Sequence, residues 1–422
     1  MRRAATIWAV AALTVAPAVC RGTDGDILGD PLTLDAAVAY ARRHNPEIRA
    51  AEARQRAAQA RPAQAGALPD PMVEVAYHNE GFDRLDLGET QFAWTRVGAS
   101  QEVPFPGKLG LKREIAVREA GQIGEESRRV EHDVVSRVKV AYAEYAHLQV
   151  QLEILRRNKA LLDKFARTTE AKYAVGEGIQ QDVLKAQVEE SLLIERETTL
   201  DQQRQSQTAD LNALLDRPPA APLGAAEHPV ERTLMRTLDD LLAAAGSHSP
   251  EVKAAEERVA GDESAVALAR REFLPDFVVS ADYMHKASLL PEWEVGLGIK
   301  VPLYFATKQR AGVQEAAASL DEARRMRESA VRNVESHIRD LYARAQASER
   351  LIALYRSTVM PQAGLALESA DAAYQVNKVD FLTLLNAFST ALEYEMRYHE
   401  ELANFQKAVA ALESVVGDPL GE

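Results

Sequence analysis

The sequence has a single cysteine, few aromatic residues and a long stretch without proline. One cysteine in 422 residues means that no disulfide can form within the chain. Aromatic residues make up 6% of the chain, proline is absent from residues 107–217, and residues 125–175 contain neither glycine nor proline. At 1.5 Å per residue, that last stretch alone is long enough for a helix of about 75 Å. Together with many alanine, leucine, glutamate and arginine residues, these absences favour long helices over compact domains.

Long hydrophobic runs are also missing, apart from a short one near the start. Met1-Arg2-Arg3 precedes an apolar run over residues 4–15, and the small residues Ala16-Pro17-Ala18 follow it. The run is well short of the roughly 20 residues that a membrane-spanning helix needs, so residues 1–20 are predicted to be a secretory signal peptide. Cys20 stands where a bacterial lipoprotein is acylated, although Val19 replaces the usual small residue before it. The sequence is compatible with two alternatives: acylation of Cys20, or an incidental cysteine near the cleavage site.

An excess of positive charge is missing too. The formal net charge is −13 at pH 7. Because nucleic-acid binding depends on basic surfaces that neutralise phosphates, this charge argues against a nucleic-acid partner.

Catalytic motifs are absent as well. Gly107-Lys108 does not complete a phosphate-binding loop, because Glu102 stands where the first glycine is required and Leu109 follows the lysine. His399-Glu400-Glu401-Leu402-Ala403 begins like a zinc-protease helix but has alanine in place of the second histidine. The sequence therefore predicts no enzymatic activity, no metal centre and no cofactor.

What the chain does have is an internal repeat. Leu34-Asp35 leads into His44-Asn45-Pro46-Glu47, and 204 residues later Leu238-Asp239 leads into His248-Ser249-Pro250-Glu251. A repeat of this length, with unlike segments kept in order, indicates that one large unit was duplicated. We expect structural repeats over residues 21–220 and 221–422, each starting with a helix that ends at this motif. His44 and His248 would then cap the negative helix ends, with metal binding as the alternative.

Heptad patterns run through the middle of each repeat. Their apolar positions, spaced alternately by four and three residues, are Val134, Val138, Ala141, Tyr145, Leu148, Leu152 and Leu155 in the first repeat and Val334, Ile338, Leu341, Ala345, Ser348, Ile352 and Tyr355 in the second. Glutamate, arginine, glutamine and lysine lie between them, so each helix should have one packed stripe and a polar remainder. The pattern fits a coiled-coil rod and a wall of helices around water equally well.

Each long helix is interrupted once. The interruptions are Tyr173-Ala174-Val175-Gly176-Glu177-Gly178 and, 201 residues later, Tyr374-Gln375-Val376-Asn377-Lys378. Glycine and asparagine tolerate the left-handed backbone that ends many helices. Asp182 and Asp380 follow near the starts of the returning helices, where carboxylates suit the positive helix end. We therefore expect long helical hairpins over residues 109–216 and 306–415.

Segments that alternate with a period of two precede each hairpin. In the clearest of them, Val295, Leu297 and Ile299 alternate with polar or small residues. Similar segments predict strand hairpins over residues 71–103 and 276–302, although Gln101 falls on an apolar face. Met72 and Met284 in these segments could contact copper or simply pack.

Strands of about ten residues suit a tilted crossing of a bilayer, and also an ordinary soluble hairpin. In an exported chain with long flanking helices, we interpret them as membrane strands whose apolar positions face lipid. The residues predicted to face a water-filled lumen are Glu74, Asp282, Glu294 and Lys300. Four strands cannot close a barrel, for which about eight are needed, so the missing strands must come from other copies of the chain.

This ordered set of features resembles the outer membrane efflux protein family, the TolC-like exit ducts, over essentially all of the mature chain. The segment Ser100-Gln101-Glu102-Val103-Pro104-Phe105-Pro106-Gly107-Lys108 resembles the strand-to-helix junction of the heavy-metal branch, of the CzcC and CusC type. The resemblance implies a mainly α fold with a transmembrane β part, in which a homotrimer forms one 12-stranded barrel in outer-membrane lipid. A coiled α-helical barrel would continue it into the periplasm.

The resemblance also implies partners and a gate. The partners would be a periplasmic membrane-fusion adaptor and an inner-membrane pump of the resistance-nodulation-division (RND) type. Passive export of heavy-metal cations is the expected function, with a drug-efflux or type I secretion duct, or a periplasmic coiled-coil scaffold or adaptor, as alternatives. The residues expected at the periplasmic tip and gate are Tyr173, Gly176, Asp182, Tyr374, Asn377, Asp380, Thr383 and Asn386. Thr383 and Asn386 occupy positions where a related drug-efflux duct has aspartates, which leaves Asp182 and Asp380 as the nearest acids.

Overall fold

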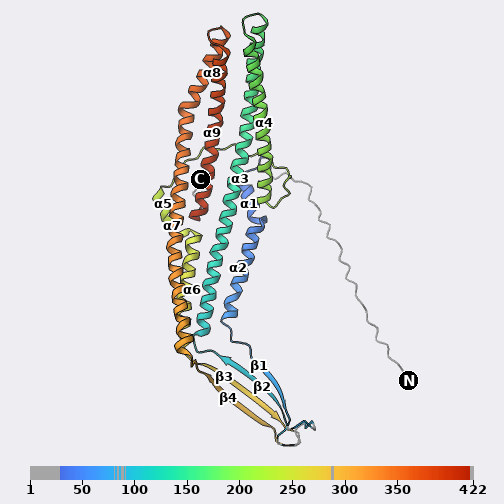
Figure 1. Cartoon of the computed structure of the whole chain (residues 1–422), viewed down its shortest axis with the longest axis vertical. Coiled ribbons are helices and arrows are strands. Elements are labelled where there is room, and N and C mark those ends of the chain that lie inside the picture. The colour runs from blue at the N-terminus through green and yellow to red at the C-terminus, as the bar shows by residue number, and fades with distance from the viewer. Residues whose placement is uncertain are drawn as a thin grey trace, which may run out of the picture.

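The chain folds into a long, narrow molecule with strands at one end and two helix turns at the other (Figure 1). The computed structural model describes residues 29–79, 81–82, 85–86, 90, 92–286 and 289–418. The predicted signal peptide over residues 1–20, with Cys20, lies outside the described residues. None of the helices in these ranges combines the length and the apolar character needed to cross a bilayer.

Each repeat begins with two helices, where the sequence predicted one. Helix α1 (Leu34–His44) ends at Asn45, whose backbone is extended, and α2 (Pro46–Ala65) starts at the next residue. The Asn45 side-chain oxygen accepts hydrogen bonds from the backbone N–H groups of Glu47 and Ile48, at 2.9 and 3.3 Å. The predicted end of the first helix at this motif is observed, and a second helix that the sequence did not predict follows it, because asparagine at the N-cap and proline at the first helical position also start a helix.

The second repeat has the same arrangement around Ser249. Helix α5 (Leu238–His248) ends there, and α6 (Pro250–Arg271) begins with proline. The ring nitrogen Nδ1 of His248 lies 3.0 Å from the carbonyl oxygen of Ala244, in the last turn of α5. His44 instead stacks on Tyr40, with ring centroids 4.3 Å apart.

Two long helical hairpins form the rest of the helical part. Their helices are α3 (Lys108–Ala174), α4 (Gln180–Leu214), α7 (Arg310–Leu354), α8 (Met360–Gln375) and α9 (Phe381–Val416). At 67 residues, α3 is about 100 Å long. The rod formed by α7 and α8 is continuous through a π-helical segment, η2 (Tyr355–Val359), and a second such segment, η1 (Phe305–Gln309), precedes α7. Pro361 follows η2, and the wider π turn accommodates its missing N–H without ending the helix.

The heptad seams lie in the core. All seven seam residues of the first repeat, from Val134 to Leu155, are buried. In the second repeat Val334, Ile338, Ala345 and Ile352 are buried, and the buried hydroxyl of Ser348 donates a hydrogen bond to Glu401 (2.7 Å). The periodicity therefore identified the packed stripes correctly.

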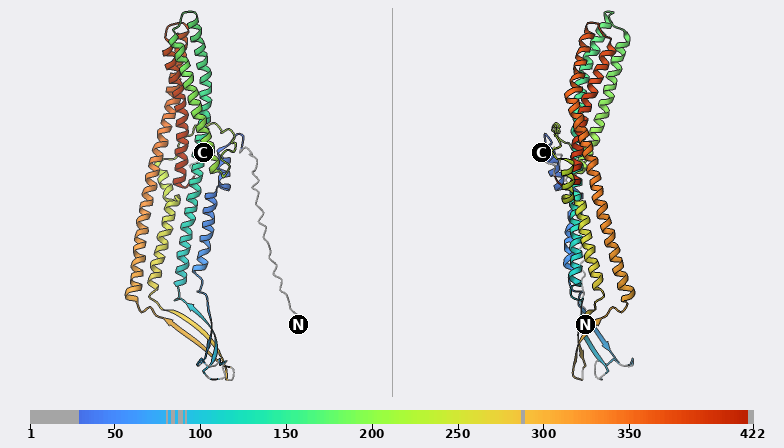
Figure 2. Two further views of the ribbon diagram at one scale, coloured as in Figure 1. Left: turned by 45° about the vertical axis from the view of Figure 1, so that its right-hand side comes forward. Right: turned by 90° about the vertical axis from the view of Figure 1, so that its left-hand side faces the viewer.

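The lower helices form a single row beside one another. Helix α2 packs on α3, α3 packs on α6, and α6 packs on α7. Figure 2 shows this row face-on in its left view and edge-on in its right view. Consequently α2 and α7 lie at the two ends of the row.

The strands lie below this row and form one sheet. Strands β1 (Met72–His78), β2 (Trp94–Val103), β3 (Asp276–His285) and β4 (Glu292–Lys300) pair antiparallel in the order β1-β2-β3-β4. The apolar positions fall in register across it: Val75 lies opposite Val97, which lies opposite Tyr283, which lies opposite Trp293. Opposed residues share a face, so the sheet has one mainly apolar and one mainly polar face.

Candidate functional site

Three of the predicted lumen residues form one row on the polar face of the sheet. The register places Glu74 opposite Gly98, Gly98 opposite Asp282, and Asp282 opposite Glu294. A Cβ atom at Gly98 would lie 2.2 Å from the Asp282 carboxylate, so the absence of a side chain there makes room for the acid.

Arg96 lies among these acids and was not identified from the sequence. Its guanidinium lies 2.8 Å from the Glu74 carboxylate and 3.8 Å from that of Asp282. Glu294, opposite Asp282, adds a third carboxylate to this row, so the three acids and Arg96 together keep a net negative charge. Such a cluster attracts cations.

Lys300 lies on the same face but nearer the helices. It is opposite Asp276 and pairs with Glu102 at 3.3 Å. It lies six positions beyond Glu294 along β4, or about 20 Å at 3.3 Å per residue.

The two turns at the opposite end have the backbone that the sequence predicted. Gly176 and Asn377 both have positive φ angles, +80° and +56°. The two tyrosines that precede them differ: the Tyr374 side chain is buried at 5% exposure, whereas Tyr173 is 47% exposed. The Tyr374 hydroxyl shares a hydrogen bond of 2.9 Å with the buried Thr169 hydroxyl of α3, so this tyrosine ties the two hairpins together.

Lys172 joins the two turns directly, and sequence analysis missed it. Its ammonium group donates to the backbone oxygens of Tyr374 and Gln375 and to the side-chain oxygen of Asn377. It also lies 4.3 Å from the centroid of the Tyr374 ring, within cation–π range. A lysine in the last turn of a helix is unremarkable in the sequence, because its partners are more than 200 residues away.

The two acids beside the turns have different surroundings. Asp380 is the N-cap of α9, and its carboxylate accepts hydrogen bonds from the Thr383 hydroxyl (2.6 Å) and backbone N–H (2.9 Å). These bonds lower the pKa of Asp380. Burial, together with the nearby Asp380 charge, raises the pKa of Asp182, while Lys185 opposes that shift. Asn386 is exposed one turn beyond Thr383 on α9.

A buried lysine fastens the junction of β2 and α3. Lys108 is 2% exposed, and its ammonium group lies 2.9 Å from Asp276, 3.0 Å from the Leu274 carbonyl oxygen and 3.3 Å from Glu272. The adjacent Gly107 has φ = +91°, and a Cβ there would meet the Arg271 guanidinium. The Gly-Lys pair, which fails as a phosphate loop, therefore connects the two repeats at the base of the helices.

The histidines and methionines considered for metal binding do not come together. Met72 and Met284 share the polar face but lie in rows that are four residues apart along β2. In the part of the chain that the structure describes, no group of three or more His, Cys, Asp or Glu side chains is placed to hold a metal ion.

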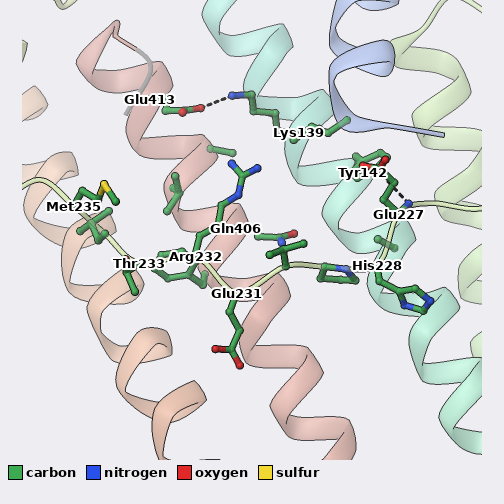
Figure 3. Close-up of a pocket in the computed structure, with 18 of the residues that line it drawn as sticks. Lys139, Tyr142, Glu227, His228, Glu231, Arg232, Thr233, Met235, Gln406 and Glu413 are labelled. Carbon is green, nitrogen blue, oxygen red and sulfur yellow. Dashed lines mark hydrogen bonds and ion pairs between the residues drawn. The ribbon is translucent and has the colours of Figure 1, made fainter. Parts of the chain in front are cut away.

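A cavity of about 600 Å³ lies where the connection between the repeats crosses α3 and α9 (Figure 3). Several of its polar groups are paired: Lys139 with Glu413, and the Tyr142 hydroxyl with the backbone N–H of Glu227 at 3.1 Å. Glu231, which also lines the cavity, accepts a hydrogen bond from Tyr398 and pairs with Arg356. These contacts hold the connection against the helices.

Both repeats match a known family. The profile of the outer membrane efflux proteins covers residues 38–217 and 241–418, which is most of the chain. The chain belongs to the outer membrane efflux protein family. It is therefore a passive channel protein and not an enzyme, in agreement with the lack of catalytic motifs.

Curated relatives within the outer membrane efflux family point to different cargoes. The chain is 23% identical to the pyoverdine export outer membrane protein OpmQ of Pseudomonas putida, over 91% of this chain and 86% of that one. It is 22% identical to the cobalt-zinc-cadmium resistance protein CzcC of Cupriavidus metallidurans, over 92% and 90%.

Solved structures of the same fold include two outer-membrane channels. The outer membrane protein VceC of Vibrio cholerae matches with a TM-score of 0.78 and 21% identity, over 92% of this chain and 97% of that one. CusC matches with a TM-score of 0.79 and 17% identity, over 93% and 94%. These likenesses confirm the TolC-like fold that the sequence predicted.

Proposed function

We propose that the chain is the outer-membrane exit duct of a tripartite RND-type efflux system, and that it passively conducts heavy-metal cations. The observation that carries this proposal is the division of the molecule into a sheet with one apolar face and, at the far end, two turns of long polar helices. A homotrimer would set the apolar faces against outer-membrane lipid and the polar faces around a lumen.

The charge of the sheet's polar face favours a cationic cargo. The row of Glu74, Asp282 and Glu294, of which the first two pair with Arg96, keeps a negative charge on the proposed lumen face, and the whole chain carries −13. A negative lining lowers the energy of a cation in a pore and raises that of an anion. The similarity to CzcC supports the same cargo, and the energy would come from the inner-membrane pump through a periplasmic adaptor.

The gate is proposed at the tip. Lys172 holds the two turns of one protomer together, so opening would require its contacts with Tyr374 and Asn377 to break or to move as a unit. Asp182 and Asp380 lie beside this clamp and would present carboxylates to the entrance.

A duct for organic molecules is the second candidate, because the similarity to OpmQ is as strong as that to CzcC. The two candidates are separated in a strain that keeps the cognate adaptor and pump but lacks this chain. Restoring the chain should lower cell-associated Co²⁺, Zn²⁺ or Cd²⁺, measured by elemental mass spectrometry, and an inactive pump should abolish the effect. Lower retention of a siderophore or drug, with metal unchanged, would assign the organic cargo. No change in either would reject the efflux role.

A further inference from the structure

Arg96 lies in a row of the sheet that offers it no acid on either side. The register sets it opposite Ala76 of β1 and Met284 of β3. Its guanidinium instead reaches the next row along β2, where it pairs with Glu74 at 2.8 Å and with Asp282 at 3.8 Å. One guanidinium therefore bridges two acids from strands that are not neighbours in the sheet.

Gly98 provides the space for this bridge. It lies on β2 between Glu74 and Asp282, and a Cβ atom there would meet the Asp282 carboxylate at 2.2 Å. Neighbouring strands are about 4.8 Å apart, so the two acids are attached to the sheet about 10 Å from each other. No side chain stands between them, and both carboxylates reach the same cationic group.

Aromatic contacts help to fix the guanidinium in this position. The Arg96 side chain is 32% exposed, and its guanidinium carbon lies 5.9 Å from the centroid of the Trp94 ring, within cation–π range. Trp94 in turn stacks on His78 of β1, with ring centroids 5.1 Å apart. Because the planar guanidinium is already oriented, it loses little conformational freedom when it pairs with the two acids.

A fixed positive charge changes how an acidic pore handles cations. Conduction requires that an ion bind favourably enough to enter and weakly enough to leave. Two carboxylates that converge on one point are ligands for a divalent cation such as Zn²⁺. Without Arg96, Glu74 and Asp282 would form such a point, and cargo ions would be retained there.

We propose that Arg96 determines the cation specificity of the barrel, by occupying the position between Glu74 and Asp282 where a divalent cation would otherwise be held. Glu294, opposite Asp282, keeps a negative charge on the same row and attracts passing cations. The proposal rests on the proposed function in requiring that this face of the sheet lines the water-filled path.

Ion block in planar bilayers tests this role. Arg96→Gln is compared with the parent in KCl while Zn²⁺ is added in steps. The variant should be blocked at a Zn²⁺ concentration at least about tenfold lower than the parent, because no guanidinium repels the ion from the two carboxylates. EDTA should reverse the block, and the permeability ratio of K⁺ to Cl⁻ should rise.

Lys300→Gln is the matched control. It removes the same charge from the same face, but Lys300 pairs with Glu102 and lies opposite Asp276, nearer the helices. Its permeability ratio should rise without any gain in sensitivity to Zn²⁺. Adding Asp282→Asn to Arg96→Gln should remove the block, since one of the two ligands is then lost.

Several results would overturn the role of Arg96. They are an Arg96→Gln pore no more sensitive to Zn²⁺ than the parent, an equal gain in Lys300→Gln, and a block that persists with Asp282→Asn. If Arg96→Gln does not assemble, Zn²⁺ present during refolding should restore the heat-resistant oligomer by replacing the guanidinium, and failure to do so would also overturn the role.

The same recordings separate this inference from the proposed function. A parent pore that prefers Cl⁻ to K⁺ would contradict the proposed cation duct. A parent that prefers K⁺, together with an Arg96→Gln pore insensitive to Zn²⁺, would leave the duct in place and overturn the role of Arg96 alone.

Discussion

A single lysine side chain connects two hairpins at the tip of the molecule. Lys172 donates to Tyr374, Gln375 and Asn377 and also packs on the Tyr374 ring. Hydrogen bonds from a charged donor are stronger than neutral ones, so Lys172 strengthens the connection that Tyr374 with Thr169 and Asn377 with Glu177 also make between the two hairpins. Lys172 should therefore help to hold the proposed gate closed.

Lys172→Met should loosen the tip, because methionine keeps the aliphatic stem but cannot donate. We expect a larger conductance in planar bilayers than in the parent. Lys378→Met is the control: Lys378 lies in the other turn at the tip, between α8 and α9, and is exposed, so its substitution removes the same charge without removing the clamp. An equal change in both variants would show that charge, and not the clamp, sets the conductance.

Acid pH should favour the packed tip through Asp182. Its pKa is raised by burial and by Asp380, so the packed tip binds a proton more tightly than an opened tip in which Asp182 is solvated. The packed tip therefore gains stability as pH falls through the range just above the ordinary aspartate pKa. Asp380 acts in the opposite direction: its lowered pKa stabilises the cap at neutral pH, and that stabilisation is lost only below the ordinary range.

The conductance of the parent protein should consequently fall as pH is lowered from neutral into the range just above the ordinary pKa of aspartate. Asp182→Asn should lack this fall, since it has no proton to bind. Asparagine is chosen over alanine so that size and hydrogen bonding are kept. Identical pH profiles for parent and variant, recorded at low salt where screening is weakest, would exclude Asp182 from the gate.

At the scale of elements, the strand-to-helix corner decides how the sheet is fixed to the helices. Lys108 from the first repeat reaches Asp276 and Glu272 of the second, and Asp276 also accepts a hydrogen bond from the Phe105 N–H at 2.8 Å. One buried ammonium group thus orients β3 relative to α3. The contacts of Lys108 and Asp276 therefore stabilise the junction between the sheet and the helices, where the proposed membrane-spanning part ends.

Lys108→Met should destabilise this corner. Removing one partner of a buried ion pair costs about 3 to 5 kcal/mol, and we expect the lower end because Asp276 and Glu272 keep some contact with solvent. Thermal unfolding of the detergent-solubilised protein measures the change. Lys112→Met, an exposed lysine one turn along α3, is the control and should unfold like the parent.

Local patterns predicted the elements of this fold, but not the contacts between them. Val138 and Leu152 are buried as predicted, because the heptad spacing that defines a packed stripe can be seen within the sequence of one helix. The left-handed turn at Asn377 was predicted for the same reason. The contacts of Lys172 and Lys108 were missed because their partners lie more than 160 residues away in the sequence. The residues next to either lysine carry no pattern that would predict such a distant partner. The start of α2 was missed because Asn45-Pro46 was interpreted only as an end signal.

For the whole molecule, the central claim is that the apolar face of the sheet lies against lipid and the polar face against water. Each face can be tested with the same new residue, arginine. Gly296 is unsuitable for the polar face, because a Cβ there would lie 2.5 Å from the Ser280 hydroxyl. Glu294 is suitable: it lies opposite Asp282, so an arginine there would replace a like-charge pair with an attractive one.

The most direct measurement compares Leu297→Arg with Glu294→Arg for folding in outer membranes and conduction in planar bilayers. An arginine on the lipid face near the bilayer midplane costs about 2 to 4 kcal/mol. Leu297→Arg should therefore yield much less heat-resistant oligomer than the parent. Glu294→Arg should assemble like the parent and conduct with a weaker preference for cations. Equal folding defects at both positions, or normal assembly of Leu297→Arg with unchanged selectivity of Glu294→Arg, would contradict the assignment of the two faces.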